Sequence, residues 1–365
     1  MVGQSFGLSA TRLSATRLAA ASASLLAFVL PGLAHADATR ISGPVVHENL
    51  AVYFVHGPSA AGRVPLTLQE ALTKGIVRVN ETGQVNELAI ENLGNEDVFV
   101  QSGDIVKGGR QDRVLMVSLI LPPRSGVIPI ASFCVEHGRW TARGTEDAKT
   151  FASSDSAVPS KEARLAMRAP VQPAAPPSTD PVGGLRHHSG PNQTADRQGR
   201  IWDSVASTQT KLKRALAAPV AAPASATSLQ LSLENEKLKD AQAAYIKALK
   251  GEGERDDDIV GYMFAVNGKL AGADLYPSNG LFRKMWAKLL AANVTEAIAE
   301  KDAGAGTPPP AESVQAFLEA ARNGTVAKRN LNAGVELETR DSDGAVYSET
   351  RRTDGGWVNR NFVAK

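Results

Sequence analysis

The sequence predicts an α+β fold, β-rich, in which an antiparallel sandwich or rolled sheet packs against several amphipathic helices. Between residues 44 and 140, short apolar or alternating runs follow one another closely and are separated by turn residues, a spacing typical of antiparallel strands. Asn267-Gly268 lies between two apolar runs and is the pair favoured where both turn residues need positive φ. Elsewhere, apolar residues recur at three- and four-residue steps, which indicates helices with one buried face.

The first part of the chain is expected to form strands and one short helix. Thr67 and Glu70 have the spacing of a capping box, which places the start of the helix. The run 114–121 is apolar on both alternating faces, so we expect a single strand in the middle of a covered sheet. Cys134 lies in the next apolar run and is expected to be an inert core thiol. The other strands are expected at residues 50–55, 76–79, 85–91, 98–100 and 126–136.

The second part of the chain is expected to be mainly helical up to a C-terminal group of strands. Helices are predicted at 201–216 and 231–250, and a third should begin at Ser278, which can cap it. The residues after Gly324 are expected to form three short antiparallel strands. Residues 153–200 contain seven prolines between Pro159 and Pro191 and few large apolar residues, which predicts a mobile insertion, interrupted at most by a short helix at 161–167.

The first 36 residues have the three parts of a secretory signal peptide. A polar start that contains Arg12 and Arg17 precedes an apolar run at 18–30, and Ala34-His35-Ala36 is a small-x-small cleavage site. A helix that spans a bilayer needs about 20 apolar residues, so we expect no permanent membrane anchor. The predicted organisation is a signal peptide at 1–36 and a single domain at 37–365, exported to the periplasm or secreted.

Composition and charge exclude several classes of protein. The chain has 365 residues, of which 43% are hydrophobic and 21% charged, a mixture unlike a multi-span membrane protein or a wholly disordered one. Lys and Arg total 40 against 38 for Asp and Glu, and the two excess charges lie in the signal peptide. The mature domain has no net charge, so it lacks the positive electrostatic potential that is typical of nucleic-acid-binding proteins. One cysteine excludes an internal disulfide and a cysteine-clustered metal site.

Two stretches of polar residues next to apolar strands form the candidate ligand-binding site. Glycines in both stretches allow backbone N–H groups to face an anion, while the arginines offer forked donors to phosphate or carboxylate. The same residues also fit a structural alternative, in which Asp104, Asp112 and Glu136 neutralise the arginines. The candidate binding residues are Asp104, Arg110, Gln111, Arg113, Glu136, Arg139 and Trp140.

The sequence offers no motif for a reaction. It contains no nucleophile elbow, no P-loop and no H-E-x-x-H pair, so no catalytic residue, metal or cofactor is predicted. Whether the protein is an enzyme therefore stays undecided from the sequence.

The chain resembles a known family through three stretches. These are Glu91-Asn92 with Gly103-Asp104, then residues 109–113, then residues 134–140 with the order Cys-Val-Glu-His-Gly-Arg-Trp. They look like the ARPP domain, which is named for its association with ADP-ribosylglycohydrolases and with rhodanese and phosphatase superfamily proteins. The resemblance implies no established reaction, but it favours ligands of the ADP-ribose or nucleotide type. Gln111, Arg113, Glu136, Arg139 and Trp140 are the residues that it carries over.

Three hypotheses about function follow. The first is an exported, non-enzymatic binding or accessory protein with an arginine-lined site for a small anionic ligand, phosphorylated or nucleotide-like. The second is a hydrolase of a phosphorylated or glycosidic substrate, with Glu136 or Asp104 as acid or base. The third is an envelope scaffold that offers the charged helix at 231–250 to a protein partner.

Overall fold

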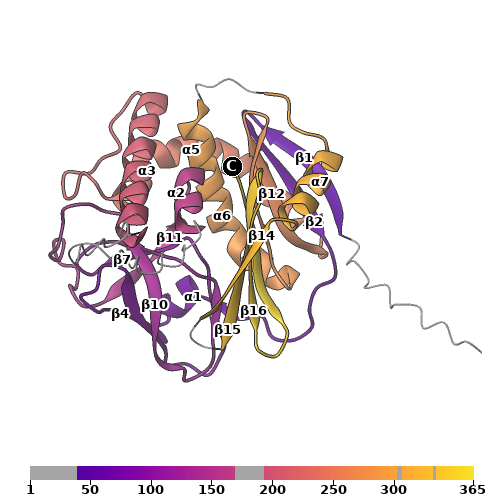
Figure 1. The fold of residues 1–365 in the computed structure, drawn as a ribbon. Helices are drawn as coiled ribbons and strands as arrows, with labels where there is room; N and C mark the ends of the chain where they lie inside the picture. The colour runs from indigo at the N-terminus through magenta and orange to yellow at the C-terminus, as the bar shows by residue number, and fades with distance from the viewer. Residues whose placement is uncertain (1–38, 169–192, 302–305, 332–333) are drawn as a thin grey trace, which may run out of the picture. The chain divides into compact units, whose positions relative to one another are not determined.

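An eight-stranded antiparallel sheet is the largest element of the fold, and the predicted α+β class is confirmed (Figure 1). The computed structural model describes residues 39–168, 193–301, 306–331 and 334–365, which all belong to the unit Asp37–Lys365. The predicted signal peptide lies outside them. In spatial order the strands are β1 (Arg40–His47), β2 (Leu50–His56), β12 (Ile259–Val266), β13 (Lys269–Leu275), β17 (Trp357–Ala364), β16 (Ala345–Arg352), β15 (Val335–Asp341) and β14 (Thr325–Leu331).

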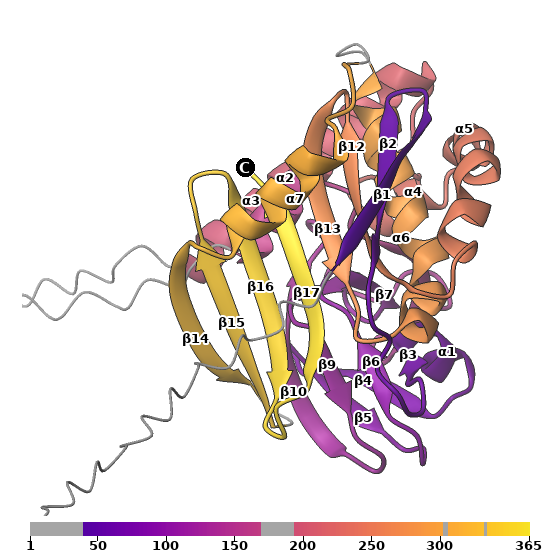
Figure 2. The ribbon, with the colours of Figure 1, turned by 90° about the vertical axis from the view of Figure 1, so that its right-hand side faces the viewer.

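The centre of this sheet is buried on both faces because a helix covers each one. Leu50, Val52 and Phe54 of β2 belong to the larger core with helix α6 (Asn279–Ala299). The alternate residues of β2 pack in a second core with Val314 and Leu318 of α7 (Ala311–Ala321). Figure 2 shows α7 lying across the near face of the sheet and α6 behind it. The alternation of β2 therefore divides its apolar side chains between two cores.

Two smaller sheets are built from the part of the chain in which strands were expected. The six-stranded sheet has the order β11 (Phe151–Ala157), β7 (Asp104–Gly108), β8 (Arg113–Leu115), β10 (Gly126–Cys134), β5 (Glu87–Asn92) and β4 (Val77–Glu81). The three-stranded sheet joins β3 (Leu66–Thr67), β6 (Val98–Val100) and β9 (Leu119–Leu121). Helix α1 (Leu68–Thr73) begins with the predicted capping box, in which Thr67 Oγ1 accepts from Glu70 N–H and Glu70 Oε2 accepts from Thr67 N–H.

The prediction of one strand at 114–121 was wrong. The structure has two strands there, β8 and β9, and they belong to different sheets. Between them, Ser118 Oγ accepts a hydrogen bond from Ser102 N–H and donates one to Asn359 Oδ1 at 3.2 Å. These contacts interrupt strand pairing in the segment between β8 and β9. Most apolar residues of the run are buried as expected, whereas Met116 and Ile120 are half-buried.

The helical region also differs from the prediction. The expected helix at 231–250 is two helices, α4 (Leu229–Leu233) and α5 (Glu236–Leu249), because Asn235 accepts from Lys237 N–H and caps the second. A 3₁₀ turn (Lys250–Glu254) follows α5. The insertion was expected over 153–200, but β11 extends to Ala157, and α2 (Lys161–Arg168) and α3 (Gln193–Leu216) flank residues 169–192, which lie outside the described residues.

The hairpin signal is confirmed, whereas the strand count at the C-terminus was wrong. Asn267 and Gly268 connect β12 and β13 with φ of 51° and 76°. Four strands follow α7, and not three, because β14 adds an exposed edge strand that lacks an apolar alternation. Among the described helices, none is long and apolar enough to cross a bilayer.

Candidate functional site

Arg113, the first residue of β8, is completely buried and forms an ion pair with Glu81 of β4. Its Nη2 lies 3.3 Å from Glu81 Oε2. Its Nη1 donates to Cys134 Sγ at 2.7 Å and to Gln111 Oε1 at 3.4 Å. Nε has no hydrogen-bond partner among the described residues, and the side chain has no solvent exposure. Arg113 therefore neutralises a buried carboxylate.

A second set of buried ion pairs lies beside it. Glu136 accepts hydrogen bonds from Arg139 Nε and Nη2, both at 2.7 Å. Asp112 accepts from Arg143 Nη1 at 2.9 Å, from Arg143 Nη2 at 3.1 Å and from Ser228 Oγ at 2.8 Å. Arg143 was not among the predicted residues. We call the set Glu81, Asp112, Arg113, Glu136, Arg139 and Arg143 the arginine network.

The donors around Glu136 keep its carboxylate ionised. Burial acts to raise the pKa of Glu136, but hydrogen bonds from Arg139, from Ser225 and from the Asp112 N–H outweigh it and lower the pKa. A general acid needs a proton near neutral pH, and this carboxylate has lost it. The geometry therefore gives no support to Glu136 as the acid of a hydrolase.

The remaining predicted residues divide between the network and a separate place. The Arg110 guanidinium lies 5.5 Å from the centroid of the Trp140 ring, and Gln111 Nε2 donates to the Glu136 carbonyl oxygen at 3.0 Å. Asp104 begins β7 and forms a buried ion pair with Lys288 of α6 at 3.0 Å, whereas Gly108 at the other end of β7 contacts the network. The structure thus groups all the predicted residues except Asp104.

Cys134 is buried, as predicted. Burial raises the pKa of its thiol to about 11, although the neighbouring Arg113 acts in the opposite direction. The thiol therefore stays protonated at neutral pH, and it is a poor nucleophile.

A cavity of about 410 Å³ lies away from the arginine network, between the six-stranded sheet and the C-terminal strands. β10 provides one wall, and β14, β15, β16 and β17 provide another. Figure 2 shows β14, β15, β16 and β17 side by side in one sheet. The chain between β8 and β9, which leaves the ladder at Ser118, also lines it. The end of α2 and the first turns of α3 complete the walls.

Three arginines line this cavity without a carboxylate partner. Arg168 ends α2, Arg197 lies in α3 and Arg329 lies on β14, and none forms an ion pair within the described ranges. Lys328 also lines the cavity, but Glu336 and Glu338 neutralise it at 3.1 and 3.3 Å. The described lining residues include no Asp or Glu. Positive charge therefore gathers here without compensation.

The pKa values of two of these arginines are lowered, chiefly by burial. Burial lowers the pKa of Arg168 to about 10; Asp274 opposes this change and Arg164 adds to it. Burial also lowers the pKa of Arg197, and the charges of Arg329 and Arg200 lower it further. Because Arg197 and Arg329 repel each other, an anion in the cavity would relieve the repulsion.

Polar atoms on the cavity wall also lack partners. Ser132 Oγ on β10 and Asn86 Oδ1 have no hydrogen bond to the part of the chain that the structure describes. Ser132 is 1% exposed. Buried polar atoms nearly always have a partner in native proteins, so these two are expected to bind water or a ligand.

Sequence reasoning did not find this cavity. Arg168, Arg197 and Arg329 come from three segments, and Arg329 lies on the edge strand that was not predicted. The sequence gives only a weak indication of this site, because Arg168 and Arg197 are two among several basic residues of the helices that flank the proline-rich stretch.

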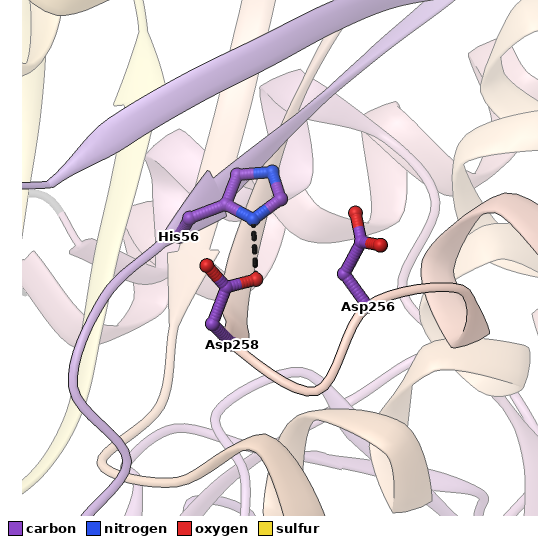
Figure 3. Close-up of side chains that lie close together, drawn as sticks. All are labelled: His56, Asp256 and Asp258. Atoms are coloured by element: carbon purple, nitrogen blue, oxygen red, sulfur yellow. Dashed lines mark hydrogen bonds and ion pairs between the residues drawn. The ribbon is translucent and has the colours of Figure 1, made fainter.

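One cluster has the ligand types of a metal site. His56, Asp256 and Asp258 each place a ligand atom within 4.8 Å of the others, and Figure 3 shows both carboxylates beside the imidazole. His56 Nδ1 lies 2.7 Å from Asp258 Oδ1 and 2.8 Å from Arg40 Nη2, while Nε2 lies 2.7 Å from Ser42 Oγ. A metal ion would have to displace the Arg40 guanidinium, so we assign the cluster as a histidine held by ion pairs.

Comparison with known proteins identifies the family. The family model of the ARG and Rhodanese-Phosphatase-superfamily-associated Protein domain, ARPP-1, matches residues 38–363. The comparison with curated proteins found no match, and neither did the comparison with solved structures. Since the matched region covers nearly the whole chain, this protein belongs to the ARPP-1 domain family.

Proposed function

We propose that this protein is an exported, non-enzymatic binding protein whose site for a small phosphorylated ligand is the cavity lined by Arg168, Arg197 and Arg329. The observation that carries the proposal is the convergence of these three guanidinium groups on one cavity whose described lining has no carboxylate. A guanidinium presents a fixed fork of N–H donors that fits phosphate oxygens in a bidentate manner.

The walls of the cavity support the same conclusion. Its volume of about 410 Å³ lies in the range of small-molecule sites, which combine apolar walls with a few convergent polar groups. Met116, Val117 and Phe133 supply apolar surface, while Ser132 Oγ and Asn86 Oδ1 are unpartnered polar atoms. Such walls suit a ligand with a charged end and a less polar body.

The arginine network has a supporting role in this proposal. β10 joins the two regions, because Ser132 and Phe133 line the cavity while Cys134 contacts Arg113 of the network. The network fixes the end of β10 with buried ion pairs, and a fixed strand holds the cavity wall in place.

Inorganic phosphate is expected to bind the cavity and to raise the melting temperature by mass action. Arg197→Gln and Arg329→Gln should each weaken phosphate binding about tenfold, which corresponds to the loss of about 1.4 kcal/mol of binding free energy. Isothermal titration calorimetry at low ionic strength, supported by thermal unfolding, measures both effects.

Arg110→Gln is the matched control, because it removes a half-buried arginine at the network and leaves the cavity unchanged. It should keep the affinity of the wild-type protein. Loss of phosphate binding in Arg110→Gln, with normal binding in Arg197→Gln, would place the site at the network. Absence of phosphate binding to the wild-type protein would refute the proposed function.

Export forms a separate part of the proposal and rests on the composition of residues 1–36. When the full chain is expressed in a bacterium with two membranes, the mature protein should appear in the periplasmic fraction or the medium with Asp37 as its first residue. N-terminal sequencing measures this. An uncleaved chain confined to the cytoplasm would contradict it.

A further inference from the structure

A second, much smaller chamber adjoins the arginine-lined cavity. Its volume is about 20 Å³, and Ser102 and Arg168 line both spaces. The sides of the chamber include Asp274 of β13, Asn361 of β17 and Asn293 of α6. A space of this size holds one group as large as a water molecule.

The chamber is surrounded by polar side chains that are buried and ordered by one another. Asp274 accepts hydrogen bonds from Asn361 Nδ2 at 2.7 Å and from the Tyr262 hydroxyl at 3.4 Å. Gln101 accepts from the Tyr276 hydroxyl at 2.6 Å and reaches Asp274 at 3.5 Å. This network has fixed geometry, because each member is less than 10% exposed.

Two atoms of the chamber residues lack an ordinary hydrogen bond in the described part of the structure. Asn361 Oδ1 is an acceptor without a hydrogen bond, and Asn293 Nδ2 makes no hydrogen bond of ordinary length. Asn293 lies close enough to the Tyr262 hydroxyl to act against the rise in the pKa of that group, so at most one of its two amide protons is engaged there. Asn293 and Asn361 are 2% and 4% exposed, so bulk water does not satisfy them. A hydroxyl group can both accept and donate a hydrogen bond, so a hydroxyl in the chamber can pair with either of these atoms.

We propose that the chamber binds one hydroxyl group of the phosphorylated ligand, so that the protein selects hydroxylated phosphate esters over plain ones. The inference rests on the proposed function, because Arg168 faces both the cavity that would hold the phosphate and the chamber that would hold the hydroxyl. A site that hydrogen-bonds a hydroxyl rejects the analogue that lacks it, since the buried donor and acceptor are then left unpaired.

Two esters of similar length test this selectivity. Glycerol 3-phosphate carries hydroxyl groups, whereas n-propyl phosphate does not. The wild-type protein should bind glycerol 3-phosphate at least tenfold more tightly in calorimetry. Asn293→Leu removes the amide donor at nearly constant volume and should bring this ratio close to one, with the affinity for n-propyl phosphate unchanged.

Asn86→Leu is the control, because Asn86 Oδ1 is likewise unpartnered but lines the large cavity and not the chamber. It should keep the preference for glycerol 3-phosphate. Asn293→Ala serves as a second variant if the leucine does not fit.

The outcomes separate the two proposals. Failure of both esters and of inorganic phosphate to bind refutes the proposed function. Equal affinities of the wild-type protein for the two esters refute the hydroxyl site alone and leave an ordered water as the occupant of the chamber. If Asn86→Leu loses the preference for glycerol 3-phosphate and both Asn293 variants keep it, the hydroxyl binds in the large cavity. This result would also overturn the inference.

Discussion

Arg113→Met is expected to lower the free energy of unfolding by about 3–5 kcal/mol, because it leaves the carboxylate of Glu81 buried without its cation. The Glu81 side chain is 4% exposed and Arg113 is 0% exposed, so water cannot replace the lost charge. Urea denaturation at pH 7 measures the change, which should appear as a lower midpoint with an unaltered slope.

The double variant Arg113→Met with Glu81→Gln is the control for this interpretation. It removes both charges, and a buried pair that is replaced as a whole costs much less than a pair that is broken. The double variant should therefore recover most of the lost stability. Both proteins should bind inorganic phosphate as the wild type does, provided that they are folded at the temperature of the titration. Unchanged stability with lost phosphate binding would show instead that Arg113 contacts the ligand.

Local signals in the sequence predicted several elements correctly. Asn267-Gly268 needs positive φ at both residues, a property of the turn itself. Thr67 and Glu70 satisfy each other's backbone N–H groups within one helical turn. Ser278 caps α6 with its side chain alone, which accepts from Leu281 N–H. Such features depend on a few neighbouring residues, and for that reason the sequence alone suffices to find them.

The elements that were wrong depend on contacts between distant parts of the chain. Ser118 interrupts the run 114–121 through hydrogen bonds to Ser102 and to Asn359, which lies 241 residues later. β14 has exposed side chains and is a strand because β15 pairs with it. The pattern of apolar residues is judged within a short stretch of sequence, which does not include these distant partners. It therefore cannot show where a strand is interrupted or with which strand it pairs.

In the candidate site, too, some features could be predicted from the sequence, whereas contacts between distant segments could not. Residues 110–113 and 136–140 were expected to meet, and the structure brings them together because β8 pairs with β10. The structural alternative predicted that Glu136 neutralises an arginine, and Glu136 pairs with Arg139. The partner of Arg113 was not predictable, since Glu81 comes from β4 and reaches Arg113 only in the folded sheet. The arginines of the cavity come from three segments that share no motif.

Arg168→Met is expected to have two opposite effects. Phosphate affinity should fall at least about 30-fold, because a buried cation that contacts an anion typically contributes 2 kcal/mol or more, and about 1.4 kcal/mol corresponds to a factor of ten. In the absence of ligand, the free energy of unfolding should rise by about 1–2 kcal/mol, because the variant no longer holds a half-buried cation that has no carboxylate of the described residues within ion-pair distance. Calorimetry and urea denaturation measure the two effects on the same preparations.

The pH dependence of the stability difference tests the second effect. Since folding lowers the pKa of Arg168 to about 10, the unfolded chain holds this proton more tightly than the folded protein does. Between about pH 10 and the ordinary pKa of arginine, the folded protein loses this proton before the unfolded chain does. The loss of free energy of unfolding that Arg168 causes therefore becomes smaller as the pH rises through this range. The difference in free energy of unfolding between Arg168→Met and the wild-type protein should accordingly be largest at pH 8 and smaller at pH 10.5. If this difference stays constant across the range, methionine stabilises the protein by packing alone. In that case the charge of Arg168 is not the cause of the lower stability of the ligand-free wild-type protein.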